Sequence, residues 1–334
     1  MIIISDLIHL PYTRDLTEGG IAYALRSLPY TYDRMGGSPY DRLRRIVASV
    51  AVELAFRRYL GEQNIPFDVK GSTPFTDPDR YDVSLGGHRC DIKSYLITYR
   101  DQILDMRRNP EVMLNAPALV PSDQHSGESH TSHDIYLFAF LAGLIAASQA
   151  DLKAVIKNNR PLYLIHAMPD IWCKPQTWSP LGALALKSES DMAQVVEISG
   201  QDKGRDFLTR MVELPARTRV VIQDEFHSLS SIHIQDMSES RIGIYSPIRK
   251  ETYLIQPMDW GNIWVYGMDI WLAGYIKREE FSRRASFIHP ESHVFQYNHT
   301  RTKNLAVPIS DLLPLKDLFE RVKDWDKTNC HMEK

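Results

Sequence analysis

The sequence predicts an α/β protein in two parts, the second of them rich in β-structure. Its 334 residues are typical of two domains. One long segment of the first half repeats apolar residues with helical spacing, whereas the chain after residue 160 consists of short β-type runs separated by Pro, Gly and Asp. We therefore expect a first domain over residues 1–160 and a β-rich domain over residues 161–334, which ends in a helical tail.

Composition excludes several other classes of protein. The chain is 43% hydrophobic and 24% charged, with a net charge of −3, so any nucleic-acid surface must be local. Its three cysteines are widely spaced, which argues against a disulfide scaffold or a structural zinc site and suits a reducing cytoplasm. The longest apolar run, residues 135–147, is too short to cross about 30 Å of hydrocarbon. We expect a soluble cytoplasmic protein with no membrane partner.

The first half contains the clearest predicted helix. Residues 1–40 mix apolar stretches with Gly-rich turns and are expected to form an irregular arm. The segment from Asp41 to Gln63 then predicts a helix with Asp41 as its N-cap and Gly61 near its end. Its apolar residues recur with helical spacing at Leu43, Ile46, Val47, Val50 and Leu54. Further along, residues 109–133 show no period and are expected to form a long loop.

A tight hairpin follows the predicted helix. Residues 81–97 read as two strands joined by Gly86-Gly87, which pairs Asp82 with Asp91 across the turn. Because directly opposed residues share a face and side chains alternate along a strand, one face is polar. This face carries Asp82, Arg89, Asp91 and Lys93. The other face carries Val83, Leu85, Cys90 and Ile92, which are expected in the core.

Two opposed carboxylates repel each other unless something neutralises them. A divalent cation between Asp82 and Asp91 would do so, and ligands that are all oxygen atoms suit Mg²⁺. The hairpin therefore predicts a cation site.

These residues resemble the PD-(D/E)XK, or restriction-endonuclease-like, nucleases. In that family a helix bearing an acid precedes a β-hairpin that carries Asp and then (Asp/Glu)-x-Lys. The matching elements here are Glu53 on the helix, Asp82 on the first strand and Asp91-Ile92-Lys93 on the second. The resemblance covers residues 41–160 and implies a restriction-endonuclease-like core, a mixed sheet flanked by helices.

Alternatives exist for individual residues. Asp-x-Lys occurs at 68–70, 91–93 and 151–153, but only Asp91 has an acid opposite it across a tight turn. Pro78-Asp79 is a second candidate for the first acid of the motif. We favour Asp82 because Asp79 has the wrong parity for the polar face. Glu53 also has a structural alternative, an ion pair with Arg57 on the same helix.

The resemblance implies a mechanism. Asp82, Asp91 and the main-chain carbonyl of Ile92 would coordinate Mg²⁺, for which Mn²⁺ can substitute, and Glu53 would contribute directly or through a water. Lys93 would orient or deprotonate the attacking water. Arg89 is a candidate contact for the substrate phosphate. The products would carry 5′-phosphate and 3′-hydroxyl ends.

The expected function is that of a Mg²⁺-dependent DNA endonuclease, of restriction or host-defence type, whose β-rich half serves recognition or assembly. Double-stranded DNA is the expected partner, and a homodimer would place one active site at each strand. Two alternatives stay open. The same fold could cleave RNA or single-stranded DNA, or the chain could be a non-catalytic binding protein that uses its β-rich half.

Overall fold

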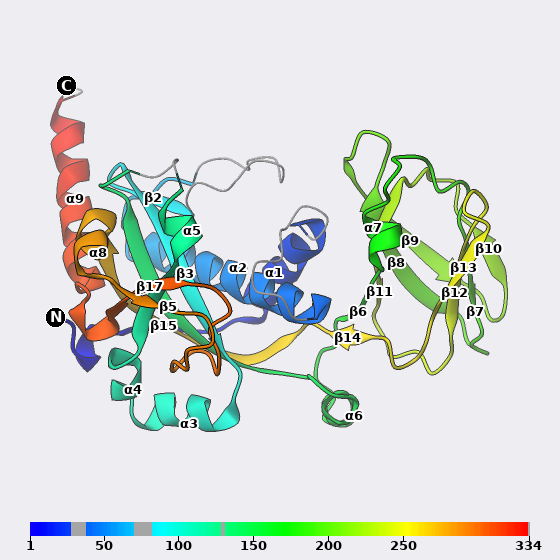
Figure 1. Ribbon diagram of the computed structural model, residues 1–334, viewed down its shortest axis with the longest axis horizontal. Coiled ribbons are helices and arrows are strands. Elements are labelled where there is room, and N and C mark those ends of the chain that lie inside the picture. Colours follow the sequence, from blue (N-terminus) through cyan, green and yellow to red (C-terminus); the bar gives the residue numbers. More distant parts are fainter. Residues whose placement is uncertain (28–37, 70–81, 128–130, 333–334) are drawn as a thin grey trace.

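The computed structural model describes residues 1–27, 38–69, 82–127 and 131–332, with side chains as far as residue 324. The chain forms a larger part that contains both termini and a smaller β-rich part beside it (Figure 1). None of the helices in the described ranges combines the length and the apolar character needed to span a membrane.

The larger part is built on a curled, mixed sheet of five strands in the order β1-β15-β5-β3-β2. The bounds are Ile8–Leu10 for β1, Val83–Leu85 for β2, His88–Ile97 for β3, Ile135–Ile145 for β5 and Val265–Lys277 for β15. Strands β3 and β5 run parallel, and the other neighbouring pairs run antiparallel. Strand β5 is buried along all but its last two residues, as expected for a central strand covered on both faces.

Three helices pack in the core on one face of this sheet, namely α1 (Arg14–Ser27), α2 (Pro39–Glu62) and α9 (Leu315–Met332). Helix α2 buries Ala51, Val52 and Phe56 against a cluster that includes Ile92 of β3. It begins one turn earlier than predicted, because Ser38 is the N-cap and Asp41 closes a capping box with it. The helical C-terminal tail is confirmed by α9.

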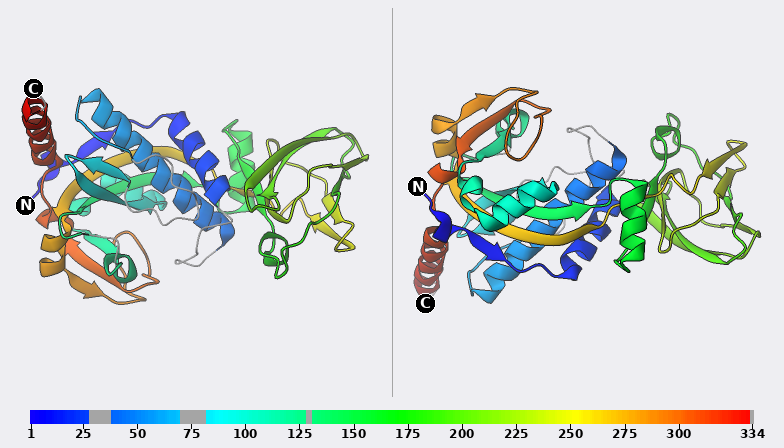
Figure 2. Two further views of the ribbon diagram at one scale, coloured as in Figure 1. Left: turned by 90° about the horizontal axis from the view of Figure 1, so that it is seen from above. Right: turned by 90° about the horizontal axis from the view of Figure 1, so that it is seen from below.

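The other face carries shorter elements (Figure 2). They are α3 (Arg100–Arg108), α4 (Glu111–Leu114), α8 (Arg278–Arg284) and a small sheet of β16 (Ser286–Ile288), β17 (Asn304–Pro308) and β4 (Pro117–Pro121), which α5 (Ser122–His125) follows. The prediction of an unstructured loop over residues 109–133 is therefore wrong in part, since it contains α4, β4 and α5. Elements of four or five residues are too short to produce a readable period.

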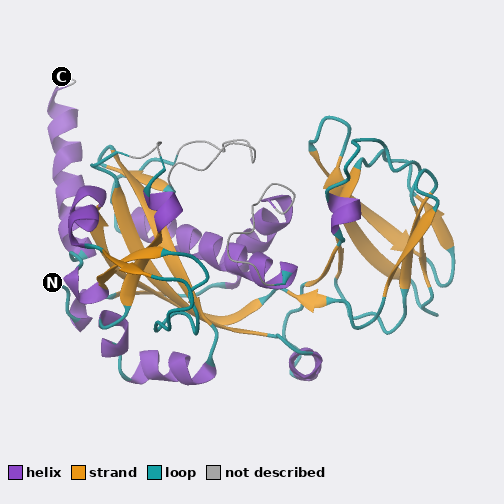
Figure 3. Cartoon of the chain, viewed as in Figure 1, coloured by secondary structure: helices purple, strands orange, loops and turns teal. Residues whose placement is uncertain are grey.

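The β-rich part, whose β content the sequence predicted, consists of two sheets (Figure 3). One has the order β10-β7-β12-β13, with bounds Arg219–Val221, Ala185–Ser188, Ile242–Ser246 and Glu251–Ile255. The other has the order β14-β6-β11-β8-β9, with bounds Gly261–Asn262, Leu164–Ala167, Ser228–Ile234, Gln194–Gln201 and Phe207–Leu214. Their shared apolar cluster contains Leu186, Ile198 and Ile232. Helix α6 (Gln149–Lys157) precedes these sheets, and α7 (Asp170–Cys173) lies after β6.

The division of the chain differs from the expected boundary at residue 160. Strand β15 pairs with β5 from Val265↔Ile145 to Lys277↔Ile135, so the chain returns to the larger part at β15 and stays there. The β-rich part is therefore inserted between two neighbouring strands of that sheet. The expected irregular N-terminal arm is also wrong, since it contains β1 and α1. The α/β class with an added β-rich part is confirmed, while a restriction-endonuclease-like core stays a prediction.

Candidate active site

The hairpin has the predicted register at three pairs, whereas the predicted pair of Asp82 with Asp91 is not part of the ladder. Strands β2 and β3 pair as Val83↔Cys90, Ser84↔Arg89 and Leu85↔His88. Both turn glycines have positive φ, 54° for Gly86 and 80° for Gly87, which a two-residue hairpin turn of this kind requires. The apolar face is buried as expected, with Val83, Leu85, Cys90 and Ile92 in the helix-covered core.

Asp82 lies one residue before β2, just outside the paired ladder. Its amide N–H donates to the carbonyl of Cys90 at 3.0 Å. Its carboxylate Oδ2 accepts a hydrogen bond from the amide of Ile92 at 2.5 Å. The Asp82 carboxylate is therefore directed across the hairpin, toward the strand that carries Asp91 and Lys93.

Lys93 is held by three groups. Its Nζ lies 2.6 Å from Asp91 Oδ2 and donates to Gln124 Oε1 at 3.0 Å. It also lies 5.9 Å from the ring centroid of Tyr136, within the range of a cation–π contact. Gln124 belongs to the short helix α5, so the sequence contained no periodic signal that could have identified it. These contacts fix an ammonium group beside the Asp91 carboxylate.

Glu53 forms the ion pair that was its structural alternative. Its carboxylate lies 3.7 Å from the guanidinium of Arg57, one turn further along α2. Arg57 in turn donates to the main-chain carbonyl of Asp82 at 2.7 Å, which ties the helix to the hairpin. Arg57 is thus a positioning residue that sequence analysis treated only as an alternative partner for Glu53.

The three carboxylates share one electrostatic environment. Burial raises the pKa of Asp82 well above its ordinary value, and the negative charges of Glu53 and Asp91 raise it further. The hydrogen bond from Ile92 and the charge of Lys93 oppose this shift without cancelling it. The ionised carboxylate of Asp82 is therefore repelled by two other acids, and a bound cation would offset that repulsion.

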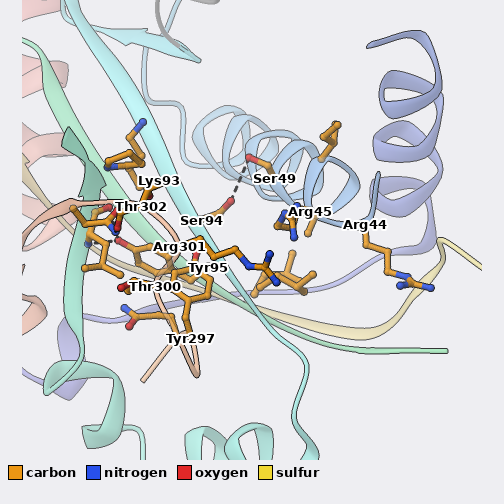
Figure 4. A pocket seen from close by; sticks show the side chains of 18 of the residues that line it. Arg44, Arg45, Ser49, Lys93, Ser94, Tyr95, Tyr297, Thr300, Arg301 and Thr302 are labelled. Atoms are coloured by element: carbon orange, nitrogen blue, oxygen red, sulfur yellow. Dashed lines mark hydrogen bonds between the residues drawn. The ribbon is translucent and has the colours of Figure 1, made fainter. Parts of the chain in front are cut away.

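All four predicted catalytic side chains line one cavity of about 950 Å³. The wall on one side is α2, whose residues Arg45, Ser49 and Glu53 follow each other at a spacing of four. The opposite walls are β3, the β4–α5 segment and residues 296–304. The Ser94 hydroxyl of β3 lies 3.3 Å from the Ser49 hydroxyl, where helix and strand meet (Figure 4).

Arg89 does not line this cavity. Its Nε and Nη2 atoms each lie 3.0 Å from one carboxylate oxygen of Asp134, which is only 5% exposed. Burial works against ionisation of Asp134, but hydrogen bonds from Thr131 and the Arg89 guanidinium outweigh it and lower the pKa of that carboxyl. This arrangement differs from the predicted phosphate contact, because Arg89 is already paired with a buried acid.

The donor set suits Mg²⁺ in charge and in atom type. Within the described ranges no group of three or more His, Cys, Asp or Glu side chains is arranged around a metal position. However, Mg²⁺ commonly uses only one or two protein carboxylates and completes its shell with waters and substrate phosphates. Asp82 and Asp91 fit that pattern, with Glu53 acting at longer range. The alternative acid Asp79 lies outside the described residues.

Comparisons with models of known protein families, with curated protein sequences and with solved structures found no match.

Proposed function

We propose that the chain is a Mg²⁺-dependent endonuclease that hydrolyses phosphodiester bonds in DNA. One observation carries the proposal. A cavity holds Asp82, whose pKa is raised by burial and by the neighbouring carboxylates of Glu53 and Asp91, with the ammonium of Lys93 beside them. Mutually repelling carboxylates favour a divalent cation, and an adjacent ammonium favours an anionic substrate.

Each residue of the site would have its own role in phosphodiester hydrolysis. Asp82 and Asp91 would hold Mg²⁺, together with the carbonyl of Ile92 and, through a water, Glu53. When bound, Mg²⁺ neutralises charge on the scissile phosphate and acidifies a coordinated water. The amide of Ile92 holds one oxygen of Asp82, which leaves the other free to act as a ligand. Lys93, kept in place by Asp91 and Gln124, would orient the attacking water and stabilise the pentavalent transition state.

The same proposal includes the substrate, the biological role, the location and the oligomeric state. We propose duplex DNA as the substrate, a restriction or host-defence role, a cytoplasmic location and a homodimer. They rest on the resemblance of Glu53, Asp82 and Asp91-Ile92-Lys93 to the PD-(D/E)XK nucleases. The β-rich part would supply recognition or assembly contacts.

The test compares Lys93→Ala with Lys153→Ala, which changes the lysine of another Asp-x-Lys triplet, on the exposed face of α6. Plasmid DNA, single-stranded DNA and RNA are incubated with each protein in Mg²⁺, Mn²⁺ or EDTA. We expect metal-dependent DNA cleavage with 5′-phosphate ends by the wild type and Lys153→Ala, and a rate roughly 10²–10⁴-fold lower for Lys93→Ala.

Other outcomes would change the conclusion. Cleavage of RNA with duplex DNA untouched would assign the site to RNA. If neither the wild type nor Lys93→Ala cleaves any of the substrates, the nuclease proposal is wrong and the chain is a binding protein. If both cleave at the same rate, Lys93 has no catalytic role.

A further inference from the structure

The cavity extends well beyond the carboxylates. Arg45 precedes Glu53 by eight residues on the same side of α2, which is about 12 Å along the helix axis. Arg301, from the segment 296–304, lines the same cavity. In Figure 4 the Arg301 side chain extends from that segment toward α2, and Arg45 leaves the helix nearby, whereas Lys93 points away from both. One end of the cavity is therefore acidic and the other carries two arginines.

Arg301 stands on an anchored loop. Its neighbour Thr300 is only 2% exposed, and the Thr300 amide donates to the carbonyl of Ser292 at 2.9 Å. The Thr300 hydroxyl donates to the carbonyl of His289 at 2.7 Å. On the other side of the loop tip, the Asn298 amide group donates to the Tyr99 hydroxyl at 2.9 Å. Within the described part of the chain, Arg301 has no ion-pair partner, so its charge faces the cavity uncompensated.

Arg45 lies against the same loop. Burial raises the pKa of Tyr297 to about 12, and the positive charge of Arg45 is the one influence that opposes the shift, which places Arg45 near this side chain. Asp41 lies near both Arg44 and Arg45: burial works against ionisation of Asp41, but hydrogen bonds from Ser38 and the charges of the two arginines lower the pKa of its carboxyl. Arg44 is buried, pairs with Asp41 at 3.0 Å and donates to the main-chain carbonyl of Asn262. Arg45 and Arg301 therefore give this end of the cavity a net positive charge.

We propose that Arg45 and Arg301 form a second phosphate-binding subsite, which holds the nucleic-acid backbone at a distance from the scissile phosphate. This inference rests on the proposed function. The distance between the two sites follows from the eight residues that separate Arg45 from Glu53, which is about 12 Å along α2. Guanidinium groups suit the role, because their planar fork binds phosphate oxygens in a bidentate manner.

The test measures binding separately from cleavage. A short fluorescein-labelled DNA duplex is titrated by fluorescence anisotropy in Ca²⁺ buffer at several salt concentrations. The variants are Arg45→Ala, Arg301→Ala, their combination and the control Arg108→Ala, which changes an exposed arginine of α3 outside the cavity. We expect each cavity variant to bind about tenfold more weakly and to lower the slope of log K against log salt by about 1, with the control unchanged.

The outcomes separate this inference from the proposed function. If the wild type cleaves DNA in Mg²⁺ and Lys93→Ala does not, yet the arginine variants keep the wild-type affinity and salt slope, only the subsite is wrong. If no nucleic acid is cleaved but the arginine variants lose affinity and slope, the subsite holds and the nuclease proposal fails. A wild type that does not bind the duplex would overturn the subsite. Thermal unfolding of each variant confirms that a loss of binding does not reflect misfolding.

Discussion

The amide of Ile92 donates a hydrogen bond to Asp82 Oδ2 at 2.5 Å, and so holds the first acid of the hairpin against the strand that carries the second. This bond favours the ionised form of Asp82. Burial and the charges of Glu53 and Asp91 disfavour it more strongly, so the pKa of Asp82 in the folded chain is raised. The site therefore keeps its acids together at a cost in stability.

Replacement of Asp82 by Asn is expected to stabilise the metal-free protein. A raised folded-state pKa means that the native chain binds more protons than the unfolded chain, so stability falls as pH rises from the ordinary value of 3.8 through the raised one. Asn removes that cost and can still accept the bond from Ile92. Thermal unfolding in EDTA should show a higher Tm for Asp82→Asn at pH 7, with the gap closing as the pH is lowered toward 4.

Mg²⁺ should reverse this order, because a ligand that binds only the folded state raises its stability. It is expected to raise the Tm of the wild type and to leave that of Asp82→Asn unchanged. If Asp82→Asn is less stable than the wild type at pH 7 without metal, the ionised carboxylate of Asp82 does not destabilise the folded chain.

Gln124→Leu is expected to impair catalysis without affecting substrate binding. The change removes the acceptor that holds Lys93 Nζ at 3.0 Å and keeps a side chain of similar size. Loss of such an orienting partner should lower kcat by roughly 10-fold or more and leave KM unchanged. Gln149→Leu, at the half-buried start of α6 outside the cavity, removes a hydrogen bond to the main-chain carbonyl of Met258 and is the matched control. Wild-type kcat for Gln124→Leu would show that α5 does not position Lys93.

Arg89→Ala is expected to act on stability. It leaves the buried carboxylate of Asp134 without its guanidinium partner, which typically costs about 3–5 kcal/mol. Urea unfolding at pH 7 measures this loss, and the double variant Arg89→Ala, Asp134→Asn should recover part of it. A fully stable Arg89→Ala that binds DNA weakly would instead favour the phosphate contact predicted from the sequence.

The same pair predicts a pH dependence of opposite sign to that of Asp82. Because the folded-state pKa of Asp134 lies below its ordinary value of 3.8, its contribution to stability is present above that value and is lost as pH falls through the folded pKa. In Arg89→Ala the carboxyl keeps the bonds from Thr131 but loses those from the guanidinium, so this part of the acid-induced loss should become smaller. An unchanged acid profile in the variant would show that Arg89 does not hold the Asp134 carboxylate.

Local signals predicted the central part of the site. The Gly86-Gly87 turn sets the hairpin register through its two positive φ angles, and the alternation of residues 82–93 then places polar and apolar side chains on opposite faces. The helical period of α2 likewise comes from contacts three and four residues apart. Strand β5 lies in the longest apolar run of the sequence, as is typical of a strand covered on both faces.

The features that could not be predicted from the sequence depend on contacts between distant parts of the chain. Arg89 meets Asp134 because β3 and β5 run parallel, with Cys90 beside Ile135, and no local period encodes that register. Arg301 reaches the cavity only because β15 returns to the first sheet after the β-rich insertion. These residues lie far apart in the sequence but come together in the fold. The predicted boundary at residue 160 is wrong for the same reason.

The most direct test of the central claim is an anomalous-scattering crystal structure of the protein soaked in Mn²⁺. We expect a strong anomalous peak between the carboxylates of Asp82 and Asp91, at roughly 2.0–2.2 Å from their oxygen atoms. The Lys93 ammonium should lie close to the peak, and Glu53 should be linked to it through a water. A fully ordered hairpin with no peak there, or with its acids turned to opposite sides of the sheet, would contradict the central claim.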